Sequence, residues 1–225
     1  DVVAAAQRLA DGAEALRDRA PEAASVAASL TVSEYLLPRW LTRLRSTTPD
    51  ARVAVEAVNS AAVLRLVADG VHPLGFVETP GPTPGLRTSR IAWDELIVVV
   101  APGHPWVRRR GVTAAELAAT PLVARESGSG TRLAAERALR EAGFEPALPA
   151  AELPTSSGIR TAVASGLAPA VLSILAVRDD VDGGRLARVP VTDLRIVREL
   201  RAVRRPDGEL PPVLRALLRV ARSVG

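Results

Sequence analysis

Several residue types are rare or absent in this sequence. Its 225 residues include no cysteine, no methionine and no lysine, and aromatic residues make up only 3%. The absence of cysteine excludes disulfides, thiol nucleophiles and thiolate metal ligands, and the absence of lysine excludes Schiff-base chemistry. The only histidines, His72 and His104, each precede a proline, and no serine has the Gly-x-Ser-x-Gly setting of a nucleophile elbow. We therefore expect no enzyme, no metal site and no cofactor.

Long hydrophobic runs are missing as well. The apolar run at residues 97–101 is among the longest, and it is far shorter than the ~20 residues that cross a bilayer. No charged segment followed by an apolar segment stands at the beginning. The sequence therefore indicates a cytoplasmic protein without membrane segments, although a chain cleaved after a signal peptide would look the same.

The charges of the two signs nearly balance. All 29 basic residues are arginine, and 25 acidic residues leave a formal net charge of +4. Such a balance is typical of a solvated surface of mixed sign and not of a face that binds nucleic acid. The densest basic run, at residues 108–110, follows a Pro-Gly-His-Pro turn and is interpreted as an exposed loop.

Apolar residues near the beginning recur with the 3.5-residue period of a coiled-coil seam. We expect a helix over residues 1–20 that ends before Pro21 and packs either on a partner helix or on its own domain. The seam positions are Val2, Ala6, Leu9, Ala13, Leu16 and Ala20.

From Ser25 onward, short apolar segments alternate with amphipathic ones. The first predicted strand leads to a helix with Leu37, Trp40 and Leu44 on one face, because these residues recur at helical spacing. Repeated strand–helix units of this length predict a parallel sheet with helices on both faces. The predicted strands are residues 25–30, 53–58, 74–77, 96–101, 121–125, 147–153, 168–172 and 195–203, and the later helices include 131–142, 159–165 and 211–222.

Two sets of such units indicate an α/β fold of two Rossmann-like lobes joined by two crossover strands, similar to periplasmic binding proteins, with an N-terminal linker helix. We expect lobe I to comprise residues 25–98 and 204–225 and lobe II to comprise residues 99–203, with a first crossover at the turn of residues 102–105. Open α/β sheets bind ligands beyond the carboxyl ends of their strands, so the two lobes should enclose one ligand cleft.

The segment LTVSEYLLP at residues 30–38 resembles the start of the effector-binding domain in LysR-type transcriptional regulators, where a strand ending in Ala-Ser precedes a helix marked by Leu-Pro. Further matching segments follow in the order and register of that family. No single segment is specific, but their common order and spacing make the resemblance specific. They are residues 48–50, 58–60, 66–70, 75–78, 98–105, 125–132 and 163–173.

Two departures from the family pattern affect the interpretation. Family members commonly have Leu-Asp before the Gly-Phe strand, where this sequence has His72 and Pro73, so the local loop should differ. The family also places a winged helix-turn-helix before a long dimerising helix. The resemblance therefore implies that residues 1–22 are the C-terminal part of this linker helix and that the chain is a piece of a longer regulator. It also implies a homodimer or homotetramer that contacts operator DNA only through the N-terminal helix-turn-helix.

Hydroxyl and amide side chains stand at the predicted strand-to-helix junctions. Ser29, Thr31 and Ser33 lie where the first strand becomes a helix, and Asn59 and Ser60 lie at the second junction. Helix starts present unpaired backbone N–H groups and a partial positive charge, which favour a bound carboxylate or phosphate. The same residue types are ordinary helix caps, so each residue alone fits either role.

A glycine-rich loop, SGSGTR at residues 127–132, is the strongest local signal. Its two glycines let consecutive N–H groups form an anion nest, to which hydroxyl groups and an arginine add donors. The loop lacks the lysine and the spacing of a P-loop, and a flexible loop capped by Thr131 is the alternative. The candidate effector-binding residues here are Ser127, Ser129, Thr131 and Arg132, joined by Thr155 and Ser156 at a later junction. The resemblance implies the same cleft role for Ser29, Thr31, Ser60, Ser129, Thr155 and Ser156.

These features predict a sensor in which a small organic anion bridges the two lobes, changes the angle between them and thereby controls transcription. Two other classes remain open. An exported solute-binding protein of a transporter has the same two-lobed architecture. An enzyme of the two-lobed deaminase or dehydratase kind would need a general acid or base in the cleft, for which Glu126 or Glu152 is the candidate.

Overall fold

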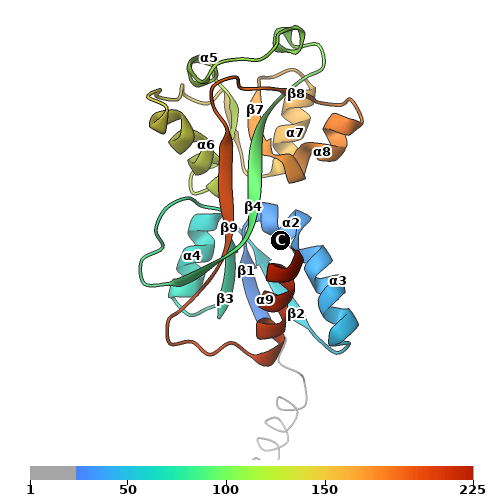
Figure 1. Cartoon of the computed structure of the whole chain (residues 1–225), viewed down its shortest axis with the longest axis vertical. Helices are drawn as coiled ribbons and strands as arrows, with labels where there is room; N and C mark the ends of the chain where they lie inside the picture. The colour runs from blue at the N-terminus through green and yellow to red at the C-terminus, as the bar shows by residue number, and fades with distance from the viewer. Residues whose placement is uncertain (1–23, 225) are drawn as a thin grey trace, which may run out of the picture.

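The computed structural model describes residues 24–224, so the linker helix predicted over residues 1–22 lies outside the described residues. Two α/β lobes are stacked along the long axis of the molecule (Figure 1). In chain order the elements are β1 (Ala24–Ala28), α2 (Leu30–Tyr35), α3 (Leu37–Thr47), β2 (Val53–Ala57), α4 (Ser60–Ala68), β3 (Leu74–Val77), β4 (Arg87–Val100), η1 (Pro105–Arg108), α5 (Ala114–Ala119), β5 (Val123–Arg125), α6 (Gly130–Glu141), β6 (Ala151–Leu153), α7 (Ser156–Ala164), β7 (Ala170–Ser173), α8 (Ile174–Asp182), β8 (Ala187–Val189), β9 (Ile196–Arg204) and α9 (Pro212–Val224).

The main sheet is mixed and not parallel throughout as the sequence predicts. Its strand order is β2-β1-β3-β9-β4-β7, and β8 also pairs with β4. The pairs of β1 with β2 and with β3 are parallel, as expected for strand–helix–strand units. Every pair made by β4 or β9 is antiparallel, because these two strands carry the chain from one lobe to the other and back. A separate parallel pair, β5 with β6, completes the upper part.

The crossover from one lobe to the other lies inside β4. Ile91 belongs to the lower hydrophobic cluster, whereas Leu96 and Val98 of the same strand belong to an upper one. The hydrophobic contacts of β4 thus change from one cluster to the other between Ile91 and Leu96, whereas the turn of residues 102–105 follows the end of β4. A shift in register between Arg90 and Ala92 precedes the crossover. Below, lobe I denotes residues 24–92 and 199–224, and lobe II denotes residues 95–196.

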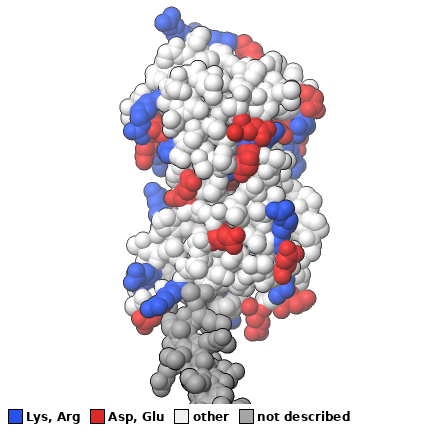
Figure 2. Space-filling model, turned by 180° about the vertical axis from the view of Figure 1, so that it is seen from behind, with Lys and Arg blue, Asp and Glu red and all other residues white. Residues whose placement is uncertain are grey.

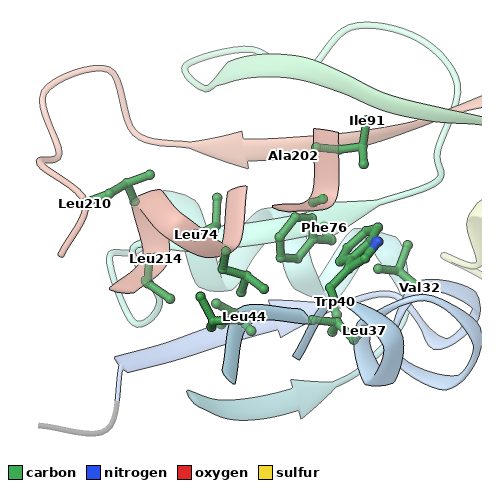
Figure 3. Packing of buried hydrophobic residues seen from close by; sticks show 14 of the residues in the cluster. Val32, Leu37, Trp40, Leu44, Leu74, Phe76, Ile91, Ala202, Leu210 and Leu214 are labelled. Atoms are coloured by element: carbon green, nitrogen blue, oxygen red, sulfur yellow. The ribbon is translucent and has the colours of Figure 1, made fainter. Parts of the chain in front are cut away.

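Lobe I buries an aromatic pair at its centre. Trp40 of α3 and Phe76 of β3 have ring centroids 5.2 Å apart, and both side chains are almost fully buried. Leu214 of α9 packs into the same cluster, so α3 and α9 cover one face of the sheet (Figure 3). The i, i+3, i+7 spacing of Leu37, Trp40 and Leu44 puts these residues on the inner side of α3, as predicted.

Helix α4 covers the other face of the sheet in lobe I. Gly75 of β3 permits this close approach, because a Cβ atom there would lie 2.7 Å from side-chain atoms of Val63 and Val67. Lobe II repeats the arrangement of two helical layers. Helices α5 and α6 pack with Leu96 and Val98 on one face of β4, and α7 and α8 pack on the other. Within the described range, no helix combines the length and the apolar character needed to cross a membrane.

Candidate functional site

A buried polar network lies where the two lobes meet. Lobe I contributes Ser29 and Glu78, which immediately follow β1 and β3, at the carboxyl ends of these parallel strands. Lobe II contributes Thr131 in the first turn of α6. The crossover strands contribute Asp94 and Arg198, and all five residues are at most 3% exposed.

Arg198 and Asp94 form the central ion pair of this network. They are cross-strand neighbours of β9 and β4, and Nε of Arg198 donates to Oδ2 of Asp94 over 2.8 Å. The hydroxyl of Ser173, at the start of α8, donates to the other carboxylate oxygen over 2.7 Å. Burial raises the pKa of Asp94 above its usual value, and Arg198 and Ser173 oppose this shift.

Glu78 connects the two lobes through its carboxylate. One oxygen accepts a hydrogen bond from Oγ of Ser29 over 3.1 Å. The other accepts one from Oγ1 of Thr131 over 3.2 Å and lies 3.4 Å from Nη1 of Arg198. The backbone N–H of Glu78 donates to Oγ of Ser60, the first residue of α4. Glu78 is thus held by both lobes at once.

Helix N-termini and an arginine surround the carboxylates of the network with positive charge. Ser60, Thr131 and Ser173 belong to the beginnings of α4, α6 and α8, where unpaired N–H groups give a partial positive charge. The guanidinium of Arg198 adds a full positive charge between the two carboxylates. In a buried site such groups interact more strongly than in water. The arrangement therefore concentrates hydrogen-bond donors and positive charge around the carboxylates of Glu78 and Asp94.

Other contacts between the lobes close the structure around this network. The backbone N–H of Ala61, in the first turn of α4, donates to the carbonyl of Gly128 over 3.2 Å. Nδ2 of Asn59 donates to the carbonyl of Ser127. Tyr35, at the end of α2, packs against the core of lobe II, and burial raises its pKa to about 12. The lobes are in direct contact, and a ligand would have to separate them or replace a group of the network.

Four of the residues predicted from the sequence join the network, namely Ser29, Thr31, Ser60 and Thr131. Thr31 accepts from Nη2 of Arg198 over 3.4 Å, and Thr131 accepts from Nη1 of Arg198 over 3.0 Å. Ser129 and Ser156 are also buried, at the starts of α6 and α7. Oγ of Ser129 has no hydrogen-bond partner, which is unusual for a buried hydroxyl group.

The remaining predicted residues have local partners instead. Ser33 bonds to a carbonyl of its own helix, and Asn59 and Thr155 cap α4 and α7. Ser127 is exposed. Arg132 pairs with Glu136 and Glu152 at 2.7 and 2.6 Å, so its charge is directed away from the network. Of the two glycines in the predicted anion nest, Gly128 has a positive φ of 87°, and Gly130 lets α6 approach lobe I closely.

Sequence reasoning missed the three charged residues of the network, Glu78, Asp94 and Arg198. One signal was available for Arg198. In β9, residues 196, 198, 200 and 202 share the buried face, so the alternation of the strand places this arginine among apolar side chains. A charged residue at such a position requires a buried partner, which points to a polar site.

Gly130 allows the start of α6 to contact lobe I. A Cβ atom there would lie 2.6 Å from Cγ of Glu78 and 2.8 Å from Oγ of Ser60. We expect Gly130→Ala to force the lobes apart and to lower the free energy of unfolding by about 1–3 kcal/mol, as overpacking does. Urea denaturation and small-angle X-ray scattering would measure both effects. Gly103→Ala is the matched control, because no atom lies within 4 Å of its added Cβ. An unchanged scattering profile and stability of Gly130→Ala would contradict the expectation.

Open space adjoins the network on one side. A hollow of about 500 Å³ lies between α6, β9 and the loop after β3, and its lining includes Thr79, Trp93 and Arg198. Seen from behind the view of Figure 1, acidic and basic side chains are interspersed over the described residues, without a continuous basic patch in view (Figure 2). Among residues 24–224, no three His, Asp or Glu side chains lie together in a way that fits a metal ion.

Comparison with known proteins adds to this description. The family model described as the LysR substrate binding domain matches residues 20–225. An uncharacterized HTH-type transcriptional regulator of Mycobacterium tuberculosis is 41% identical over 218 residues, which is 92% of this chain and 69% of that protein.

Solved structures share the fold. The regulatory domain of CcmR from Synechocystis PCC6803, solved in complex with 2-PG, has a TM-score of 0.79 and 21% identity, covering 89% of this chain and 96% of that chain. The effector binding domain of QuiR in complex with shikimate has a TM-score of 0.79 and 12% identity, covering 90% and 96%.

Proposed function

Because the chain belongs to the family of LysR substrate binding domains, we propose that it is the effector-sensing part of a LysR-type transcriptional regulator. A small organic anion binds at the junction of the two lobes and controls transcription through the angle between them. The exported solute-binding protein is not favoured, because the family model is that of LysR regulators and the similar Mycobacterium tuberculosis protein is named a transcriptional regulator.

The observation that carries this proposal is the set of donors from both lobes that surrounds the Glu78 carboxylate, and we infer that this set is a receptor for oxyanions. Its donors are the hydroxyl groups of Ser29 and Thr131 and the guanidinium of Arg198, and they already hold a carboxylate. The hydroxyl of Ser129 remains free for a further acceptor. The CcmR and QuiR domains, which have the same fold, were solved with 2-PG and with shikimate, which supports a small molecule as the ligand here.

Lobe movement gives the bound anion its regulatory effect. A ligand shifts a conformational equilibrium only as far as its affinity differs between the two arrangements. Since Thr131 belongs to lobe II and Ser29 to lobe I, a ligand held by both hydroxyl groups depends directly on the spacing of the lobes.

A ligand screen tests the proposal. Small carboxylates and phosphorylated metabolites should include compounds that raise the melting temperature of the protein, and the double variant Ser129→Ala/Thr131→Ala should lose this increase. Ser46→Ala/Thr47→Ala is the matched control, because both of its hydroxyl groups bond to carbonyls of α3 far from the receptor. If the increase persists in the first double variant, the ligand binds elsewhere.

We propose that binding is not followed by chemical conversion. The two carboxylates considered as a general acid or base both form ion pairs with arginine. Glu126 accepts two hydrogen bonds from Arg125, and Glu152 pairs with Arg132. Prolonged incubation with a bound compound, followed by mass spectrometry, should return it unchanged. Conversion at a rate above the background would favour the enzyme.

DNA contact and assembly follow from the same family. We propose that a helix-turn-helix, and not residues 24–224, binds operator DNA, and that the protein acts in the cytoplasm. A dimer is supported by β2, an edge strand of the sheet whose side chains are mostly exposed.

A further inference from the structure

Glu78 occupies the position in which an anionic effector would be bound. Glu78 is 1% exposed, and its carboxylate accepts hydrogen bonds from the hydroxyl groups of Ser29 and Thr131. It also forms a salt bridge with the guanidinium of Arg198. These donors belong to both lobes and to a crossover strand. A free ligand that bridges the lobes would need the same donors.

Charge prevents Glu78 and a second anion from sharing this position. Two carboxylates, those of Glu78 and Asp94, already face the single guanidinium of Arg198. An added oxyanion would bring a third negative charge into a buried region, where like charges repel strongly.

The close packing around Glu78 also leaves no room for a second anion at this position. The Cγ of Glu78 and the start of α6 are in such close contact that a Cβ on Gly130 would lie 2.6 Å away. The open hollow beside β9 is lined by Arg198 and by Thr79, the residue after Glu78, so open volume adjoins Arg198 and the chain next to Glu78.

We propose that the Glu78 carboxylate is an internal ligand of the effector site and that the effector binds by displacing it. This inference rests on the proposed function. It specifies the ligand as a small oxyanion whose two oxygens replace those of Glu78 at Ser29, Thr131 and Arg198. Glu78 would also raise the effector concentration that is needed for binding, because the effector must compete with a carboxylate of the same chain.

Glu78→Gln tests the inference, because it keeps the shape of the side chain and removes the charge that excludes anions. Binding of sulfate and of succinate is measured by isothermal titration calorimetry. We expect the dissociation constant of at least one probe to fall by tenfold or more. Glu95→Gln is the matched control. It makes the same change in net charge on β4, where Glu95 pairs with Arg188 on the outer part of lobe II, and it should leave both constants unchanged.

A second variant serves if Glu78→Gln is unstable. Glu78→Ala leaves the donors without their acceptor, and formate or acetate should restore its melting temperature by several degrees more than that of Glu95→Ala. Equal affinities in Glu78→Gln and the wild type, without rescue of Glu78→Ala, would overturn the displacement while the Ser129→Ala/Thr131→Ala result still supports the effector site. If neither the wild type nor any variant binds an anion, the proposed function fails as well.

Discussion

Arg198→Met should lower the free energy of unfolding by about 3–5 kcal/mol, which is the usual effect of removing one partner from a buried ion pair. The substitution leaves the carboxylates of Asp94 and Glu78 buried without their common cation. It also removes donors from Thr31 and Thr131. Urea denaturation at neutral pH, followed by circular dichroism, would measure the loss.

The loss should depend on pH. Burial already raises the pKa of Asp94, and removal of Arg198 takes away the group that opposes this shift most. A carboxyl group with a higher pKa in the folded state stabilises the fold below its unfolded pKa and loses that contribution as the pH rises through the folded pKa. The deficit of the variant should therefore be smallest near pH ~4, close to the unfolded pKa of aspartate, and should grow toward neutral pH.

Two controls separate the ion pair from other effects. Arg195→Met removes an exposed arginine a few residues away and should change the stability little. Asp94→Asn/Arg198→Met removes both charges and should be more stable than Arg198→Met alone, because no unpaired Asp94 carboxylate remains. If Arg198→Met were as stable as Arg195→Met at all pH values, the buried ion pair would contribute nothing to the free energy of unfolding.

Trp40→Ala should lower the free energy of unfolding by about 3–5 kcal/mol, as truncation of a large buried aromatic residue does. Trp40 is 1% exposed and packs against Phe76 at the centre of lobe I, so its loss leaves a cavity between α3 and the sheet. Because lobe I and lobe II have separate hydrophobic clusters, the melting of lobe I should be affected first. Differential scanning calorimetry would resolve this as a lower first transition.

Trp93→Ala is the matched control for Trp40→Ala. Trp93 is 59% exposed, and its ring contacts Arg90 at 5.2 Å on the surface. Its removal should change the melting temperature little. Similar effects of the two tryptophan substitutions would contradict the assignment of the lobe I core.

Much of the fold could be predicted because apolar periodicity is local. The limits of β3 agree with the prediction at residues 74–77, and α3, α6 and α9 lie where the amphipathic segments indicated. The first half of β4 was missed, since its residues 87–95 are largely polar and face solvent on one side. Helix α8 was missed because its apolar spacing follows a strand without an intervening turn signal. The predicted division into lobes stays a prediction, although the hydrophobic clusters place the crossovers nearer to residues 94 and 198.

The candidate site was predictable only in part, for a related reason. Serine and threonine at strand–helix junctions are visible in the sequence, and Ser29 and Thr131 do lie together. Their common partner, Glu78, is 49 residues from Ser29 and 53 from Thr131. Arg198 is 104 residues from Asp94. Charged residues are mostly exposed in proteins, so the alternation of β9 can indicate that Arg198 is buried, but no local pattern indicates that Glu78 and Asp94 lie beside it. Conversely, the i, i+4 spacing of Arg132 and Glu136 is visible in the sequence and is typical of an ion pair on a helix surface, which the structure contains.

The two crossover strands also limit how the molecule can flex. Strands β4 and β9 are hydrogen-bonded neighbours across the waist, so they form a two-stranded ribbon. Sliding one lobe past the other would break every bond of this ribbon, whereas twisting it would strain each bond only slightly. The shift in register between Arg90 and Ala92 interrupts the ladder of hydrogen bonds on the side of lobe I. We therefore expect the lobes to move relative to one another by torsion, a rotation of one half of the molecule about the common axis of the two strands.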